Sequence, residues 1–167
     1  MSSMGTNQAT LEHVIAEYWP RMVRAAAGYE RNPALADELA QEMAFEVWRA
    51  LAKFEQQSAL NTYVYRVIHN VAVDHIRRAT RRHETALESE VLDDCGVGPD
   101  AALQQTQQKQ QLMQAIQRLP LSLRQVTLLR LEDLSDREIA AVLGLTETNV
   151  AVRLTRARQQ LATLMAE

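Results

Sequence analysis

The sequence predicts an all-α protein made of two small helical domains joined by a flexible acidic linker. Apolar residues recur every three or four positions through most of the 167-residue chain, which is the spacing of a helix face. Glycine and proline are scarce, at five and four residues, so long helices are favoured over a sheet. Residues 84–110 are instead rich in acidic residues and glutamine, and Gly96, Gly98 and Pro99 break any regular structure there. This stretch therefore predicts the linker.

The first domain, residues 11–83, is expected to follow a disordered leader at residues 1–10. Its first helix should cover residues 11–29, where apolar residues give one buried face. Pro20 should kink or split this helix, because proline lacks a backbone donor and clashes with the preceding turn.

The second helix, expected over residues 34–54, carries two different stripes. One stripe is apolar at four-residue intervals and predicts core positions: Leu35, Leu39, Met43, Val47 and Leu51. The other is an acidic and amide-bearing surface: Asp37, Glu38, Gln41, Glu42 and Glu46, with Phe45 and Trp48 at its border. From the pattern alone, this surface is either a solvated helix face or a docking face for a basic or amide-rich partner helix.

A third helix is expected over residues 60–82 and ends in a cluster of arginines. Five cations lie within seven residues at this end: Arg77, Arg78, Arg81, Arg82 and His83. In a protein of net charge −3 they predict a phosphate-contacting patch. Cations also stabilise a helix C-terminus through the macrodipole, so a purely structural role is the alternative. His69 and His75 have no cysteine or carboxylate arrangement around them, and we interpret both as polar surface or border residues.

The second domain, residues 111–167, is expected to contain four short helices, of which the last two form a helix-turn-helix. Ser135 and Glu138 have the spacing of a capping box at a helix start. Gly144 follows where the chain must turn, and Thr146 is placed to cap the second helix.

The second helix of this motif has a polar outward face, suited to base edges and phosphates. Its members are Glu147, Asn149, Arg153, Arg156 and Arg158. An ordinary helical hairpin with a solvated charged face is the alternative interpretation. A helix-turn-helix places this second helix in the DNA major groove, so the pattern predicts a DNA-binding domain.

Several classes of function are disfavoured by the sequence. Cys95 is the only cysteine, which excludes an internal disulfide and fits a reducing cytoplasm, and we interpret it as incidental. No stretch approaches the ~20 apolar residues of a membrane span, and residues 1–10 lack the features of a signal peptide. No glycine-rich phosphate loop, nucleophile–base spacing or metal cluster stands out. We therefore expect a cytoplasmic protein that is not an enzyme and needs no metal or cofactor.

Two blocks of sequence together resemble a known family. The first block comprises residues 37–48 (DELAQEMAFEVW) and 62–78 (TYVYRVIHNVAVDHIRR). The second comprises Leu119, Pro120 and residues 131–158. In this order, with an acidic linker between them, they resemble the extracytoplasmic-function type of bacterial RNA polymerase sigma factors.

The resemblance implies a role for each polar surface. The second helix would dock on the clamp helices of core polymerase through Asp37, Glu38, Gln41 and Glu42. The −10 promoter element would be contacted by Asn61, in a loop that captures a flipped base, and by Arg66, Asn70, Arg77, Arg78 and Arg81. The −35 element would be read by Glu147, Asn149, Arg153, Arg156 and Arg158. Tyr63 stands where the family usually has Trp, and Ala151 and Val152 replace a polar pair that is common on the recognition helix.

The implied partners are core polymerase, promoter DNA and an anti-sigma factor that wedges between the two domains. Two other functions fit the pattern without the resemblance. One is a conventional helix-turn-helix regulator with residues 11–83 as a dimerisation or sensing domain. The other is a helical polymerase-binding inhibitor that uses only the acidic helix face.

Overall fold

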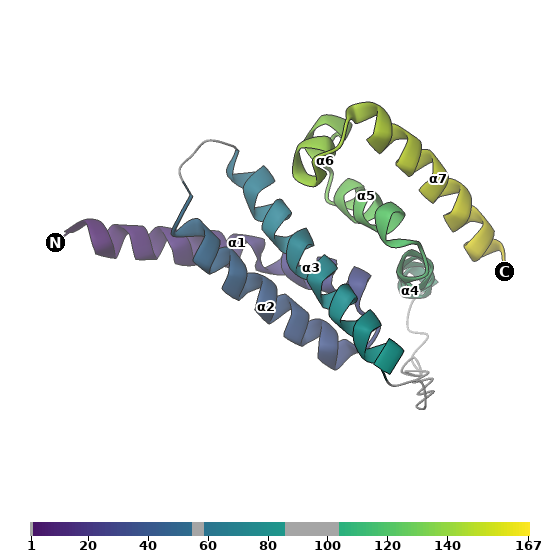
Figure 1. Cartoon of the computed structure of the whole chain (residues 1–167), viewed down its shortest axis with the longest axis horizontal. Helices are drawn as coiled ribbons and strands as arrows, with labels where there is room; N and C mark the ends of the chain where they lie inside the picture. Colours follow the sequence, from purple (N-terminus) through teal and green to yellow (C-terminus); the bar gives the residue numbers. More distant parts are fainter. Residues whose placement is uncertain (1, 55–58, 86–103) are drawn as a thin grey trace.

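The computed structural model describes residues 2–54, 59–85 and 104–167, and all regular structure in these ranges is helical (Figure 1). The N-terminal unit contains α1 (Ser2–Tyr29), α2 (Pro33–Leu51) and α3 (Leu60–Thr85). The C-terminal unit contains α4 (Gln104–Gln117), α5 (Leu121–Leu131), α6 (Asp136–Leu143) and α7 (Glu147–Ala166). The predicted all-α class is confirmed. Most of the predicted linker, with Cys95, lies outside the described residues.

Helix α1 is longer and more continuous than the sequence predicts. It starts at Ser2, within the predicted leader, and passes through Pro20 without splitting. An interior proline costs a helix about 3 kcal/mol. Buried side chains on both sides, from Tyr18 to Met22 and Ala26, hold the flanking turns against the rest of the unit and offset this cost.

Helix α2 begins at a strong local signal. The side chain of Asn32 accepts a hydrogen bond of 3.0 Å from the backbone N–H of Ala34, and Pro33 occupies the first helical position. Met43 is buried as predicted, but Leu35 is 40% exposed and its prediction as core is wrong. On a helix of 3.6 residues per turn, residues spaced four apart are rotated by about 40° from one to the next. When the middle of the stripe faces the core, its first residue, Leu35, is therefore turned toward solvent.

The helix-turn-helix has the predicted local structure. Ser135 Oγ accepts from the Glu138 backbone N–H at 3.2 Å, and Glu138 Oε1 accepts from the Ser135 N–H at 3.1 Å. Gly144 has φ +69°, a left-handed conformation that lets the chain turn without a Cβ penalty. Thr146 Oγ1 then accepts from the Asn149 N–H at 3.1 Å and starts α7. Each cap stabilises its helix by about 1 kcal/mol.

The two units pack directly against each other and share one apolar core. Helix α1 contacts α4 and α5, and α3 contacts α6. Core residues of both units, including Met43, Ile116 and Ile139, belong to the same buried cluster. Gly28 allows α1 to approach α5 closely, because a Cβ at this position would lie 2.5 Å from Leu128 Cδ2.

Polar side chains of the C-terminal unit complete the end of α1. The last carbonyls of a helix have no partner within the helix. Gln117 donates 2.7 Å to the carbonyl of Ala27, and Arg124 donates 3.5 Å to the carbonyl of Tyr29. The C-terminal unit therefore caps the helix against which it packs.

Candidate nucleic-acid and polymerase interfaces

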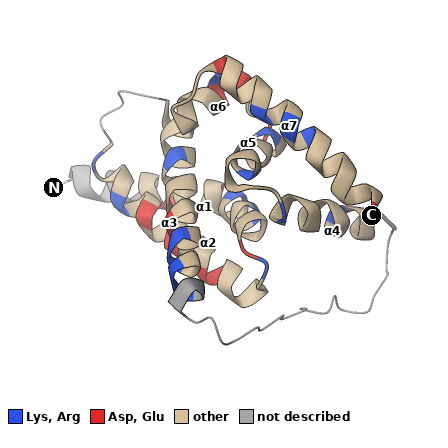
Figure 2. Cartoon of the chain, turned by 45° about the vertical axis from the view of Figure 1, so that its right-hand side comes forward, with Lys and Arg blue, Asp and Glu red and all other residues tan. Residues whose placement is uncertain are grey.

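The outward face of α7 is fixed by the residues that α7 buries. Val150, Leu154 and Ala157 are buried against α5 and α6. The recognition surface, which we define as the five predicted residues, flanks this buried stripe: Asn149, Arg153 and Arg156 lie on one side of it, and Glu147 and Arg158 on the other. All are exposed except Arg153, which is half-buried. Figure 2 shows the cations along α7.

Helix α2 presents an acidic face with an aromatic centre. Asp37, Glu38 and Gln41 are exposed, as a docking face requires. Phe45 lies on the same side, seven residues after Glu38, and is 60% exposed. The guanidinium of Arg49 lies over this ring, with its Cζ 5.8 Å from the ring centroid. Exposed aromatic and arginine side chains are enriched at protein interfaces.

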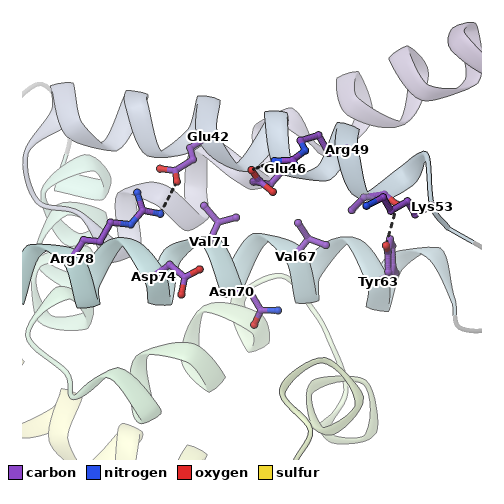
Figure 3. A pocket seen from close by; sticks show the side chains of 11 residues that line it. Glu42, Glu46, Arg49, Lys53, Tyr63, Val67, Asn70, Val71, Asp74 and Arg78 are labelled. Atoms are coloured by element: carbon purple, nitrogen blue, oxygen red, sulfur yellow. Dashed lines mark hydrogen bonds and ion pairs between the residues drawn. The ribbon is translucent and has the colours of Figure 1, made fainter.

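The fourth predicted docking residue, Glu42, lies in a groove between α2 and α3. This groove has a volume of about 480 Å³ (Figure 3). Within it Glu42 is half-buried and accepts a hydrogen bond of 3.1 Å from Arg78, while Asn70 and Asp74 line the α3 side. The predicted polymerase-binding set and the predicted −10 set therefore meet in one groove.

The predicted −10 residues on α3 divide into two groups. Asn70, Arg77, Arg78 and Arg81 are exposed along the helix. Arg66 is exposed but donates 2.7 Å to the carbonyl of Ala141 in α6, and Asn61 is half-buried with Oδ1 accepting 2.6 Å from Tyr18. The promoter-strand surface, which we define as these six residues, is therefore partly engaged by the protein itself.

The prediction that His69 is a polar surface or border residue is wrong. Its side chain is 3% exposed, and its Nδ1 shares a hydrogen bond with the hydroxyl of Tyr29. Burial lowers the pKa of His69 to about 3, because the charged ring would lose its hydration. His75 is half-buried and bonds to Glu30 at 2.8 Å. In the described ranges no group of three or more His, Cys, Asp or Glu is placed to hold a metal ion.

Three polar residues that the sequence analysis did not select meet between the units. Arg21 and Arg24 come from α1, and Glu132 follows α5. Arg21 and Arg24 follow Tyr18 on the same helix, and this pair of cations was a sequence signal for a polar contact at this end of α1. Nothing local points to Glu132, which lies 108 positions after the arginine that it pairs with.

Comparison with protein families identifies both units. Residues 14–82 match the model of sigma-70 region 2, and residues 109–161 match that of sigma-70 region 4. The chain is 28% identical over 156 residues to the RNA polymerase sigma-H factor of Pseudomonas aeruginosa, covering 87% of this chain and 81% of that protein. It is 27% identical over 180 residues to the ECF RNA polymerase sigma-E factor of Escherichia coli K12, covering 95% and 94%.

Solved structures show the same fold. The sigma factor RpoE of Bartonella quintana, in complex with the anti-sigma factor NepR, matches with a TM-score of 0.76 at 19% identity, over 93% of this chain and 96% of that one. CnrH, in complex with the cytosolic domain of CnrY, matches with a TM-score of 0.66 at 22% identity, over 95% and 89%. The chain combines region 2 and region 4 of the sigma-70 family, and it belongs to the extracytoplasmic-function sigma factors. None of the helices in the described ranges has the length and apolar character needed to cross a bilayer.

Proposed function

We propose that this chain is the promoter-recognition subunit of a bacterial RNA polymerase. It binds core polymerase through the acidic face of α2, reads the −35 element with α7, and contacts the −10 element with α3. It acts in the cytoplasm, performs no catalysis itself and needs no cofactor. The observation that carries this proposal is the pairing, in one chain, of an exposed acidic-aromatic face in region 2 with an exposed recognition surface in region 4.

The roles assigned to single residues rest on their chemistry and exposure. Arginine pairs with guanine edges in the major groove, and exposed arginines also bind phosphates. Opening the strands requires unstacking of a base, which costs a few kcal/mol and must be offset by contacts in a protein pocket. Asn61 is the residue that we assign to this capture, and Arg77, Arg78 and Arg81 would hold the neighbouring backbone.

An anti-sigma factor is the expected regulator, and the structural relative from Bartonella quintana is a complex with one. The family resemblance implies a partner that wedges between the two domains. In the structure α1 and α3 contact α4, α5 and α6 directly. We therefore propose that an anti-sigma factor either separates the units or binds around both of them.

Run-off transcription with purified core polymerase and a promoter library tests the proposal. The chain should confer promoter-specific initiation on core polymerase and should bind the same DNA weakly alone. A conventional regulator would bind its operator stably without core polymerase. An inhibitor would bind core polymerase with no gain of specific transcription. Either result would exclude the proposed function.

A variant of the acidic face of α2 tests the proposed contact with core polymerase. Glu38→Lys combined with Phe45→Ala should weaken core binding by at least about 2 kcal/mol, because it reverses a charge and removes an exposed aromatic ring. Both side chains are exposed, so the fold should be retained. Glu12→Lys, an exposed charge reversal on α1, is the matched control. Equal core affinity of both variants in a pull-down would remove α2 from the docking site.

A further inference from the structure

The side of α7 that lies opposite its buried stripe is not occupied by the recognition surface. Thr148, Val152 and Thr155 each stand two positions from a buried residue of the same helix. At about 100° per residue, each is therefore turned about 160° away from that buried neighbour. All three are exposed, and Val152 is one of the large apolar side chains that the protein leaves in solvent, at 41% exposure. The arginines of the recognition surface lie at the flanks of this side.

Three side chains here form a central strip, which we define as Ala151, Val152 and Thr155. The side chains of Ala151 and Val152 carry no polar atom. The Thr155 hydroxyl donates to the carbonyl of Ala151 at 3.0 Å, so its one proton is used within the helix. The Thr155 methyl group is left for an outside contact. The central strip therefore offers a partner apolar groups and no hydrogen-bond donor.

Cations lie on both sides of the central strip. Arg153 and Arg156 follow one edge of it, and Arg158 follows the other. Exposed arginines bind phosphates, and the first half of the second helix in a helix-turn-helix contacts base edges in the major groove. The central strip is in that half of α7. A single exposed valine is ordinary on a protein surface, but an apolar strip between arginines on a DNA-reading helix faces the bases.

The major groove presents one apolar substituent to such a strip. Guanine, adenine and cytosine expose hydrogen-bond donors and acceptors there, whereas thymine adds its C5-methyl group. Alanine and the methyl group of threonine are side-chain groups that contact this methyl in protein–DNA complexes. A polar base edge placed against the strip would lose its water without gaining a partner, which is unfavourable.

We infer that the central strip binds the C5-methyl group of thymine, so that the −35 element of this sigma factor contains an A·T pair at that point. Val152 makes the main contact, with Ala151 and Thr155 beside it. 5-Methylcytosine carries a methyl group at the same ring position, so the strip accepts this base in place of thymine. The inference rests on the proposed function, because it names the base chemistry that α7 reads in addition to its arginine contacts.

Promoter duplexes that differ by one methyl group test the central strip. The −35 sequence is first selected by run-off transcription from a promoter library. Each thymine of this sequence, on either strand, is then replaced by deoxyuridine, which keeps every hydrogen-bonding atom. Affinity for reconstituted holoenzyme, measured by competition with a fluorescein-labelled promoter, should fall about fourfold at the contacted thymine, the effect of burying one methyl-sized group. At the same position, 5-methylcytosine should bind more tightly than cytosine by a similar factor.

Val152→Ala should remove most of both methyl effects, because valine supplies the contacting groups. Alanine is a better helix former than valine, so α7 should be retained. Val23→Ala is the matched control, since Val23 is 39% exposed on α1 and the same substitution there should leave the methyl preference unchanged. Thr155→Val replaces only a hydroxyl by a methyl group, and it should also keep the preference.

Four results would overturn the inference. Equal affinity for thymine and deoxyuridine at every position would mean that no methyl group is read. A methyl preference that persists in Val152→Ala would place the contact on another residue. Loss of the preference in Val23→Ala as well would trace it to a general effect on the protein. Loss in Thr155→Val would mean that the base is read through the hydroxyl.

The proposed function is tested separately, by run-off transcription with the unmodified chain and an unmodified promoter. If this run-off is promoter-specific and the methyl effects are absent, the central strip is wrong and the proposed function stands. If the unmodified chain gives no promoter-specific run-off with core polymerase, the proposed function fails, and the inference that rests on it fails with it.

Discussion

The two surfaces proposed to contact DNA differ in what holds them. The recognition surface on α7 depends on local features: a capping box, a left-handed glycine and a threonine cap, all within 15 residues of Ser135. The promoter-strand surface on α3 depends on residues far away in the sequence. Asn61 is oriented from α1, and Arg66 bonds to α6. The recognition surface is thus exposed, whereas the promoter-strand surface is partly engaged, by the N-terminal unit at Asn61 and by the C-terminal unit at Arg66.

This difference suggests an order of events. With the two units in contact, as in the structure, four of the five residues of the recognition surface are exposed. On the promoter-strand surface, Arg66 instead donates to the carbonyl of Ala141 in the C-terminal unit, and Arg24 beside this surface pairs with Glu132 of that unit. A partner that separates the units would therefore change the promoter-strand surface much more than the recognition surface.

The largest expected effect is an acid sensitivity that originates in the N-terminal unit, at His69. The pKa of His69 is lowered from an ordinary value near 6.5 to about 3 by burial. Above pH 6.5 the ring is neutral in both states and contributes nothing. Between pH 6.5 and pH 3 only the unfolded state binds the proton, so the free energy of unfolding should fall by about 1.4 kcal/mol per pH unit.

Urea titrations at several pH values, followed by the fluorescence of Trp19 and Trp48, measure this effect. Both tryptophans lie in the N-terminal unit, and so do all four histidines of the chain, at positions 13, 69, 75 and 83. His69→Gln keeps a polar partner for Tyr29. Between pH 6.5 and pH 3 its free energy of unfolding should fall less steeply with falling pH, by about 1.4 kcal/mol per pH unit, because one proton fewer is bound on unfolding. The pair of His75 and Glu30 is unchanged in this variant and serves as an internal control. Equal slopes would mean that His69 is protonated in the folded protein.

The second effect breaks the contact between the units. In Gly28→Ala the new Cβ would lie 2.5 Å and 2.8 Å from the two methyl carbons of Leu128, which is itself buried. Overpacking of this kind costs about 1–3 kcal/mol. We expect a lower free energy of unfolding and a larger radius of gyration in small-angle X-ray scattering, because α1 and α5 are pushed apart.

Gly144→Ala is the contrasting variant within the C-terminal unit. A Cβ at Gly144 meets no atom within 4 Å, so the cost there is only that of the left-handed backbone, about 1 kcal/mol. Gly144→Ala should lower the free energy of unfolding without changing the radius of gyration. If both variants behaved alike, the closeness of α1 and α5 would not be what holds the units together.

The sequence predicts the features that depend on neighbouring residues and misses those that depend on residues far apart in the chain. Ser135, Glu138, Gly144 and Thr146 act within a few positions of one another, so their pattern was sufficient to predict the helix-turn-helix. His69 was misplaced because its partner, Tyr29, lies 40 positions earlier. A polar residue on a helix face gives no sign of a buried partner on another helix. The packing of the two units and the pairing of Arg24 with Glu132 were beyond sequence patterns for the same reason.

The third effect concerns base reading by the recognition surface. Arg153 is half-buried on the outward side of α7, beside the buried Leu154. An arginine that pairs with a base edge discriminates by about 1–3 kcal/mol, so Arg153→Ala should reduce transcription roughly tenfold on the preferred −35 sequence. Promoters altered at the one base pair that it reads should lose little. The measurement is run-off transcription by reconstituted holoenzyme across a −35 substitution series. A uniform loss on all promoters would make Arg153 a phosphate contact.

The smallest effect is expected from Arg77→Ala, on the promoter-strand surface. Arg77 is exposed on α3, more than two turns before the last residue of this helix, Thr85, so any contribution to the helix end is small and a contact with DNA phosphates is its expected role. A phosphate contact carries no sequence information, so all promoters should weaken alike, and the slope of log K against log salt should fall by about one unit. Holoenzyme binding measured at four salt concentrations on the same −35 series provides the slope. Because the helix-end contribution is within the protein, it would lower thermal stability without changing the slope. A slope unchanged from the unmodified protein, with a lower melting temperature, would therefore assign Arg77 to α3 rather than to DNA.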